Sequence, residues 1–248
     1  MKKIEMLLPE LPYAIEEALN RLRINIKFCG KNTKRILITS SVPNEGKSFI
    51  TVQLWRLLAE AGFPTVMLDL DLRKSVLKTR HDMKLDEEVK GLDYYLSGQS
   101  EYEEVVYETN VENGYIVPCT THLENPTTLF EDSRFKELLE KLGEEYRYVL
   151  IDTPPLINVS DGTQIAAYCD GAILVVRSGY TSKKLIKESM NQLKRAKCKL
   201  LGTVLNRVDT SGSRYGKYYG YNKYYRYGYY NRYYQYYGEN TKDGDGKK

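Results

Sequence analysis

Two kinds of hydrophobic pattern alternate along most of this chain. Short, nearly continuous apolar runs, among them RILITS, TVMLDLD and GAILVVRS, are typical of buried β-strands. Longer segments between them, such as TSKKLIKESMNQLKRAK, repeat their apolar residues at the spacing of an amphipathic helix. Apolar strands that alternate with helices predict a mostly parallel central sheet with helices on both faces. The predicted fold class is therefore α/β.

The same patterns place the expected elements along the chain. Turn-forming and charged residues separate them, and we expect the stretch 73–90 to be irregular. The expected order is helix 14–28, strand 35–40, helix 49–62, strand 65–71, short helix 91–98, strand 114–119, helix 128–146, strand 148–155, helix 161–169, strand 171–178, helix 181–197 and strand 200–208.

The turn SVPNEGKS, residues 41–48, lies where a predicted strand passes into a predicted helix. This context predicts a P-loop, in which backbone N–H groups and a helix N-terminus face nucleotide phosphates. Ser41 stands where the usual pattern has its first glycine. The alternative is a polar turn that happens to contain GKS, and the flanking strand and helix disfavour it. The residues expected to contact ATP here are Pro43, Asn44, Glu45, Gly46, Lys47, Ser48 and Phe49.

Polar side chains also follow three other predicted strands. Asp69 and Asp71 are two residues apart, so both can point toward a nucleotide pocket at the carboxyl end of the sheet. A solvated acidic loop is the alternative for this pair. Asp152 ends the run YVLID in a Walker B arrangement, which holds Mg²⁺ directly or through water. Asn206 ends a further strand, where its amide could contact an adenine edge.

The end of the chain has a different composition. From Ser213 onward there are eight Lys/Arg and three Asp/Glu, a net charge of +5, whereas the rest of the chain carries −1. The segment repeats Tyr, Gly, Arg and Asn without an aliphatic residue, so it cannot bury enough surface to fold and we expect it to be disordered. A basic, aromatic appendage predicts contact with something anionic. Of the 23 tyrosines in the chain, 13 lie here: Tyr215, Tyr218, Tyr219, Tyr221, Tyr224, Tyr225, Tyr227, Tyr229, Tyr230, Tyr233, Tyr234, Tyr236 and Tyr237.

The cysteine and histidine content and the lack of long apolar runs bear on which kinds of site and location are expected. The four cysteines are far apart and form no CxxC pair, which predicts free thiols in a reducing cytosol. Only two histidines are present, so a histidine-based zinc site is not expected. We find neither a signal peptide nor an apolar run of membrane-spanning length.

With these motifs in chain order, the sequence resembles the bacterial tyrosine kinases (BY-kinases) of capsule and exopolysaccharide synthesis. The matching segments are SVPNEGKS, VMLDLDLR, VLIDTPP and LLGTVLNRVD, and GLDYYLSG and ENPTTLF are similar to landmarks between them. The resemblance implies a P-loop NTPase-like kinase domain over residues 31–210, with ATP and Mg²⁺ as cofactors. It implies these roles: catalysis by Lys47, Asp69, Asp71 and Asp152; metal binding by Ser48, Asp69 and Asp152; and further ATP contacts from Arg73, Asn206 and Arg207.

The resemblance also explains the tail, residues 211–248, as a substrate that the enzyme phosphorylates on its own tyrosines. It favours transfer in trans within a ring of unphosphorylated chains, an octamer in the family. The ring would assemble through the amphipathic helix of an N-terminal segment, residues 1–30. In that helix Glu17 and Arg23 match a Glu-x-x-Arg-x-x-Arg pattern, but Asn20 takes the middle position and Arg21 is adjacent. A helix that simply packs on the core is the alternative, and Thr128, where an acid is more usual, is a second departure.

Partners and location follow from the same resemblance. A chain without a membrane span corresponds to the separate type of kinase, which we expect in the cytoplasm at the inner face of the membrane. A transmembrane polysaccharide co-polymerase would hold and activate it, and a protein-tyrosine phosphatase would reset the tail. No nucleic-acid partner is expected.

Two other classes of protein fit parts of the sequence. A partition- or division-site-type ATPase, a nucleotide switch without kinase activity, shares the fold and the paired acids. Its loop carries a signature lysine five residues before the P-loop lysine, where this chain has Val42. An RNA-binding module would account for a Tyr/Arg/Gly-rich tail but would leave the P-loop without a role.

Overall fold

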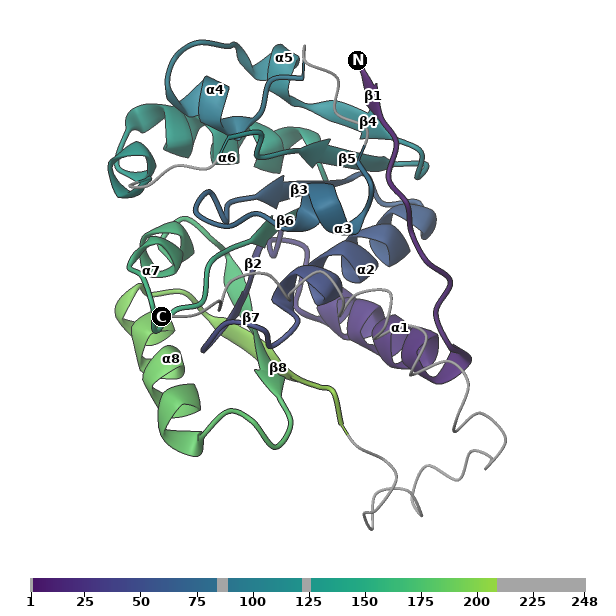
Figure 1. Ribbon diagram of the computed structural model, residues 1–248, viewed down its shortest axis with the longest axis vertical. Coiled ribbons are helices and arrows are strands. Elements are labelled where there is room, and N and C mark those ends of the chain that lie inside the picture. Colours follow the sequence, from purple (N-terminus) through teal and green to yellow (C-terminus); the bar gives the residue numbers. More distant parts are fainter. Residues whose placement is uncertain (1, 84–88, 122–125, 209–248) are drawn as a thin grey trace, which may run out of the picture. The chain divides into compact units, whose positions relative to one another are not determined.

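A computed structural model describes residues 2–83, 89–121 and 126–208, and the predicted tail lies outside them. Most of the expected strands and helices are present, within a few residues of their predicted ends (Figure 1). The elements are β1 (Lys3–Ile4), α1 (Tyr13–Phe28), β2 (Arg35–Ser40), α2 (Lys47–Glu60), β3 (Thr65–Asp69), α3 (Leu77–Arg80), α4 (Leu92–Leu96), α5 (Tyr102–Val105), β4 (Tyr107–Thr109), β5 (Gly114–Val117), the 3₁₀ helix η1 (Thr127–Phe130), α6 (Ser133–Glu145), β6 (Tyr148–Asp152), α7 (Asp161–Ala166), β7 (Gly171–Arg177), α8 (Lys183–Arg195) and β8 (Leu200–Asn206).

The described strands form one sheet in the order β1-β4-β5-β3-β6-β2-β7-β8. All neighbouring strands run parallel except β4 and β5, which are antiparallel. The predicted mostly parallel sheet is therefore confirmed. Its central strands β3, β6, β2 and β7 are buried almost throughout, which explains why their sequences are nearly continuous apolar runs.

Helices cover both faces of this sheet, as predicted. Helix α2 packs on β2, β3, β5 and β6 with α1 outside it, while α4, α6, α7 and α8 lie on the opposite face (Figure 1). On the α2 face Trp55 is fully buried, and its indole N–H lies 3.1 Å from the carbonyl oxygen of Thr65 and 3.0 Å from that of Tyr115. On the other face Leu37, Leu139 and Leu174 belong to one apolar core.

Several predicted boundaries were wrong, and three of them lie close to the motifs or have a local cause. The expected helix 128–146 is divided into η1 and α6, because the carboxylate of Asp132 caps α6 by accepting a 2.8 Å hydrogen bond from the backbone N–H of Arg134. The strand expected over 65–71 ends at Asp69, so Asp71 lies beyond it. The strand expected over 148–155 ends at Asp152, before a pair of prolines.

The short elements β1, α3, α5 and β4 were not predicted, and α3 lies in the stretch expected to be irregular. Strand β1 adds to the sheet edge through parallel pairing with β4, where Lys3 is opposite Glu108. The backbone N–H of Met6 then donates to the side-chain oxygen of Asn110 at 2.9 Å. The N-terminal segment therefore contributes a strand to the sheet as well as the predicted helix.

Candidate active site

Parallel pairing brings the predicted motifs to one edge of the sheet. The P-loop follows β2, and the adjacent strand β6 ends at Asp152. Asp69 at the end of β3 is the direct register partner of Asp152. Because the carboxyl ends of parallel strands meet at one edge, three motifs separated along the sequence form a single site.

The backbone of the P-loop is shaped for phosphate binding. Gly46 has φ 94° and is the N-cap of α2, where it provides no side-chain cap for the first-turn N–H groups. A Cβ at this position would lie 2.1 Å from Nδ2 of Asn206, so only glycine fits. Uncapped N–H groups at a helix N-terminus are suited to a phosphate oxygen. This geometry fits the expected nucleotide.

Lys47 points into a group of three acidic side chains. Its Nζ lies 2.9 Å from Oδ2 of Asp71, 3.8 Å from Oδ2 of Asp152 and 3.3 Å from Oγ of Ser48. Burial alone would lower the pKa of Lys47, but the charges of Asp152 and Asp71 outweigh that effect and raise it. The lysine therefore carries a stable positive charge at the end of the P-loop.

The carboxylates themselves are almost completely buried. Asp69 is 2 % exposed, and burial together with the charge of Asp152 raises its pKa to about 7. Its Oδ2 accepts a hydrogen bond from the hydroxyl of Ser75, and its Oδ1 accepts one from the backbone N–H of Asp71 at 3.3 Å. Asp152 is 1 % exposed, and burial raises its pKa as well. The hydrogen bond from the backbone of Asp71 to Asp69 holds Asp71 at the site, although Asp71 lies beyond the end of strand β3.

This arrangement fits Mg²⁺. Three buried carboxylates face one lysine, which leaves an excess of negative charge that a divalent cation would balance. The donors are the hard oxygen ligands that Mg²⁺ prefers, and Mg²⁺ sites commonly combine one or two carboxylates with substrate phosphates. The hydroxyl of Ser48 lies beside the same lysine, with its Oγ 3.3 Å from Nζ of Lys47. We infer that Ser48, Asp69 and Asp152 are the residues that would hold the ion.

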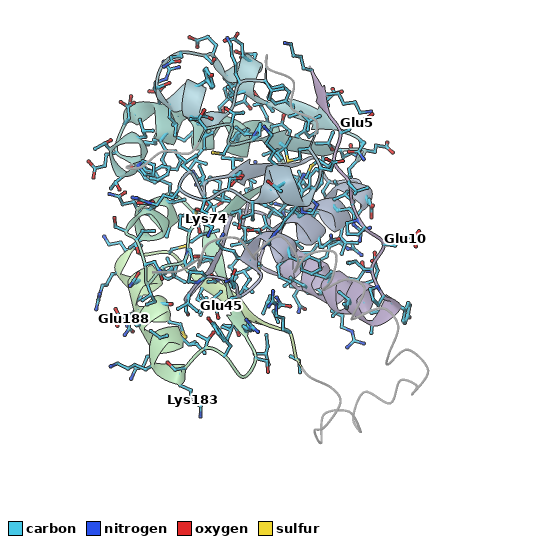
Figure 2. The ribbon with its side chains drawn as sticks, in the orientation of Figure 1. Glu5, Glu10, Glu45, Lys74, Lys183 and Glu188 are labelled. Carbon is cyan, nitrogen blue, oxygen red and sulfur yellow. The ribbon has the colours of Figure 1, made fainter. Side chains whose placement is uncertain are left out.

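The side chain of Glu45 has a role that the sequence did not indicate. It is fully buried, and its carboxylate accepts hydrogen bonds from the backbone N–H groups of Val42 at 2.8 Å and Arg177 at 3.0 Å. The hydroxyl of Thr181 donates a third bond to it. Glu45, labelled in Figure 2, therefore links the P-loop to the end of β7 and to the turn that follows it. Its predicted contact with ATP would have to involve its backbone.

Arg73, another predicted ATP contact, is engaged in a second link. Its guanidinium donates to both carboxylate oxygens of Asp161, at 2.6 and 3.2 Å, and to the hydroxyl of Thr127 at 3.3 Å. Asp161 is fully buried at the start of α7. The sequence analysis did not identify Asp161 or Thr127 as partners of Arg73. An acid in the first turn of a helix is common, so nothing in the sequence singled out Asp161.

The remaining P-loop and adenine candidates either support the loop or lie partly or fully exposed. Asn206 donates from Nδ2 to the carbonyl oxygen of Glu45 at 2.9 Å, so its amide supports the loop, and its contact with adenine stays a prediction. Ser41, in place of the usual glycine, lies 2.9 Å through its Oγ from Oγ of Ser189 on α8. The other candidates are the exposed Pro43, Asn44 and Arg207 and the half-buried Phe49.

The residues predicted to form a ring lie on α1, away from this site. Arg21 is exposed, and Glu17 and Arg23 are half-buried. The Nε of Arg23 donates to the side-chain oxygen of Asn20 at 3.3 Å. Asn20, which departs from the family pattern, is therefore in contact with Arg23, which matches it. Ring assembly stays a prediction. The predicted phosphorylation sites in the tail lie outside the described residues. Among the helices that the structure describes, none has the length and apolar character of a membrane span.

Comparison with known proteins places the chain in a family. A family model described as an AAA domain matches residues 33–204. Tyrosine-protein kinase CpsD of Streptococcus agalactiae is 37 % identical over 206 residues, which cover 83 % of this chain and 89 % of that protein. The crystal structure of the chimerical protein CapA2B2 is 30 % identical, with a TM-score of 0.73 and coverage of 81 % of this chain and 87 % of that one.

A likeness to a division ATPase is weaker. The septum site-determining protein MinD of Pyrococcus horikoshii, solved with Mg-ADP, is 27 % identical, with a TM-score of 0.61 and coverage of 72 % of both chains. The two structures share the P-loop fold. The tyrosine kinase CpsD is more similar in sequence and covers more of the chain, and it agrees with the motifs that meet at the sheet edge. The chain therefore belongs to the bacterial tyrosine-protein kinase family of capsule and exopolysaccharide systems.

Proposed function

We propose that this chain is an ATP- and Mg²⁺-dependent protein-tyrosine kinase that phosphorylates the tyrosine cluster of its own tail. The observation that carries the proposal is the cluster in which Lys47 lies 2.9 Å from Asp71 and 3.8 Å from Asp152. A P-loop lysine beside buried carboxylates is suited to bind a nucleoside triphosphate together with a metal. Family membership supports tyrosine as the acceptor, since the relative is named a tyrosine-protein kinase.

The site supplies positioning and charge for phosphoryl transfer. Lys47 and the first-turn N–H groups of α2 would bind the phosphate oxygens, and Mg²⁺ would neutralise charge on the β- and γ-phosphates. The tyrosine oxygen bonds to the γ-phosphorus, the bond to the leaving ADP breaks, and the phenolic proton passes to Asp69 or Asp71. Because such a transition state is loose, holding the phenol in line contributes more than deprotonating it.

Electrostatics supports the tail as substrate. From Ser213 onward the tail carries +5, and the site presents three carboxylates and the phosphates of its nucleotide. Each phosphate added to a tyrosine contributes about −1.5 to −2 charges, so about three of them cancel the charge of the tail. Phosphorylation would thus weaken the attraction that brought the tail to the site. We propose transfer in trans, between chains of an unphosphorylated ring, an octamer, that uses Glu17, Arg21 and Arg23.

The cellular role follows from the family. The kinase would regulate the synthesis and export of a capsular or extracellular polysaccharide. Its activator would be the cytoplasmic end of a transmembrane polysaccharide co-polymerase, which would hold the kinase at the inner face of the membrane. A protein-tyrosine phosphatase would remove the phosphates.

The test is incubation of the full chain with ATP, Mg²⁺ and a fragment of such an activator, followed by intact mass measurement and peptide mapping. We expect a series of single-phosphate mass steps that map to the tail. Lys47→Met should abolish the series, and the matched control Lys136→Met, an exposed lysine on α6, should leave it unchanged.

Two results would contradict the proposal. Phosphorylation of Lys47→Met equal to that of the wild type would remove the P-loop from the mechanism. ATP hydrolysis without any mass series would favour the nucleotide switch of the partition and division ATPases. A further experiment distinguishes transfer within one chain from transfer between chains. Lys47→Met is mixed with an otherwise wild-type chain whose tail is deleted, and only transfer in trans can then phosphorylate the tail of the inactive chain.

A further inference from the structure

Helix α8 and the residues just after it form a basic segment in a part of the chain that is otherwise acidic. Residues 183–199 contain seven Lys/Arg and one acidic residue, a net charge of +6. The rest of the chain before Ser213 has 22 basic and 29 acidic residues, a net charge of −7. All seven cations are exposed: Lys183, Lys184, Lys187, Lys194, Arg195, Lys197 and Lys199.

Within the part of the chain that the structure describes, these cations have few partners. Among the described residues, Glu188 is the one carboxylate that approaches any of them, at 3.6 Å from Arg195. The opposite side of the helix is fixed in the core through Leu193, and Ser189 bonds to Ser41 of the P-loop. Helix α8 therefore holds its basic face outward on a rigid support. Figure 2 shows the side chain of Lys183 pointing away from the body.

An apolar side chain lies within the basic face. Lys183, Lys187, Met190 and Lys194 are spaced by four, three and four residues, so they form one row along α8, which we call the lysine row. Met190 is 41 % exposed in the middle of it. A methionine flanked by lysines is suited to an interface where apolar and anionic groups lie side by side, as they do at the headgroup level of a bilayer.

We propose that the lysine row of α8 is a direct docking surface for anionic phospholipid headgroups. Helix α8 carries five Lys/Arg in all, the three of the row included, which is within the range of four to eight that is typical of helices that bind anionic membranes. Nucleic acid is a poorer fit, because six of the seven cations are lysine and residues 183–199 include no aromatic side chain to stack on a base. The surface acts in addition to any protein activator, and it does not depend on the kinase activity.

The test is co-sedimentation of the full, unphosphorylated chain with lipid vesicles. One set contains phosphatidylcholine alone, and the other contains about 40 % phosphatidylglycerol, at about 0.1 M salt. We expect binding to the anionic vesicles only. The variant Lys183→Gln/Lys187→Gln/Lys194→Gln should lower the partition coefficient by at least about tenfold.

The tail is also basic, so a matched control is needed. Lys217→Gln/Lys223→Gln/Lys242→Gln removes the same charge from the tail of the same full chain, and it should lower binding less than the α8 variant does. Circular dichroism should show that both variants stay folded. Equal losses in the two variants would mean attraction by net charge alone, and would overturn the proposal. So would equal binding to vesicles of phosphatidylcholine.

A second substitution tests whether the surface contacts the bilayer itself. Met190→Ser should weaken vesicle binding several-fold, whereas Met190→Leu should keep it, because the side chain enters the apolar boundary. Binding to a short duplex DNA serves as the comparison. If the α8 variant loses DNA binding more than vesicle binding, or if Met190→Ser binds vesicles as well as Met190→Leu, the surface is not a lipid site.

Discussion

The carboxylate of Glu45 should contribute strongly to the free energy of unfolding, although Glu45 lies in the P-loop beside the exposed residues Pro43 and Asn44. Replacement by alanine would leave the N–H groups of Val42 and Arg177 and the hydroxyl of Thr181 without their acceptor in a fully buried position. A hydrogen bond to a charged group contributes about 1.5–3 kcal/mol, and water entering the small cavity would recover part of three such bonds. We therefore expect Glu45→Ala to lower the free energy of unfolding by about 4 kcal/mol.

The assay is urea unfolding of the nucleotide-free protein. Glu45→Gln keeps the shape but turns one N–H donor toward another, so we expect an intermediate loss of about 1–2 kcal/mol. Glu60→Ala is the matched control, because Glu60 pairs with Arg56 on the exposed side of α2 and should cost at most about 1 kcal/mol. The released P-loop should also bind ADP about tenfold more weakly in Glu45→Ala. A Glu45→Ala protein as stable as Glu60→Ala, with unchanged ADP affinity, would refute the reasoning.

Three further predictions concern the acidic cluster and its supports. The pKa of Asp69 is raised to about 7 from an ordinary 3.8, so its ionisation should destabilise the metal-free protein as the pH rises from about 4 to 7. Asp69→Asn should flatten that pH dependence in urea unfolding, and an unchanged slope would contradict it. Asp152→Asn should weaken nucleotide binding only when Mg²⁺ is present; titrations with the metal that match the wild type would argue against this role. Asp161→Asn should cost about 2 kcal/mol through its bonds to Arg73, whereas Glu103→Gln in an exposed pair should cost almost nothing.

Local patterns predicted the elements that pack on both faces of the sheet. Strands such as β2 and β7 are recognisable because they are buried throughout, and their order along the chain placed Lys47, Asp69 and Asp152 at one edge. The same signal failed for β4, which has three residues with an exposed one in the middle. A strand this short gains its stability from pairing with β1 and β5, and single-sequence periodicity does not contain that pairing.

The side-chain partners within the site could not be predicted for a related reason. Glu45 accepts from Arg177 and Arg73 donates to Asp161, pairs that are 132 and 88 residues apart in the chain. A P-loop motif predicts phosphate contacts for all of its residues, so the sequence predicts that Glu45 contacts ATP. In the structure the carboxylate of Glu45 instead accepts hydrogen bonds from the protein's own backbone. Asp71 reached the site by a different route from the expected one, through a turn bonded to Asp69 rather than along a strand.

The order of strands in the sheet has a consequence for synthesis of the protein on the ribosome. Strand β2 carries the phosphate loop and emerges early, yet its two neighbours in the sheet are β6 and β7, which begin at Tyr148 and Gly171. Until those residues have been made, β2 has no strand on either side, and its apolar side chains have no sheet to join. Strand β2 must therefore avoid pairing with other strands until β6 and β7 have been made, by which time more than half of the protein has been translated. The nucleotide site can form only as the last strands arrive, so ATP can stabilise the finished domain but cannot guide its early folding.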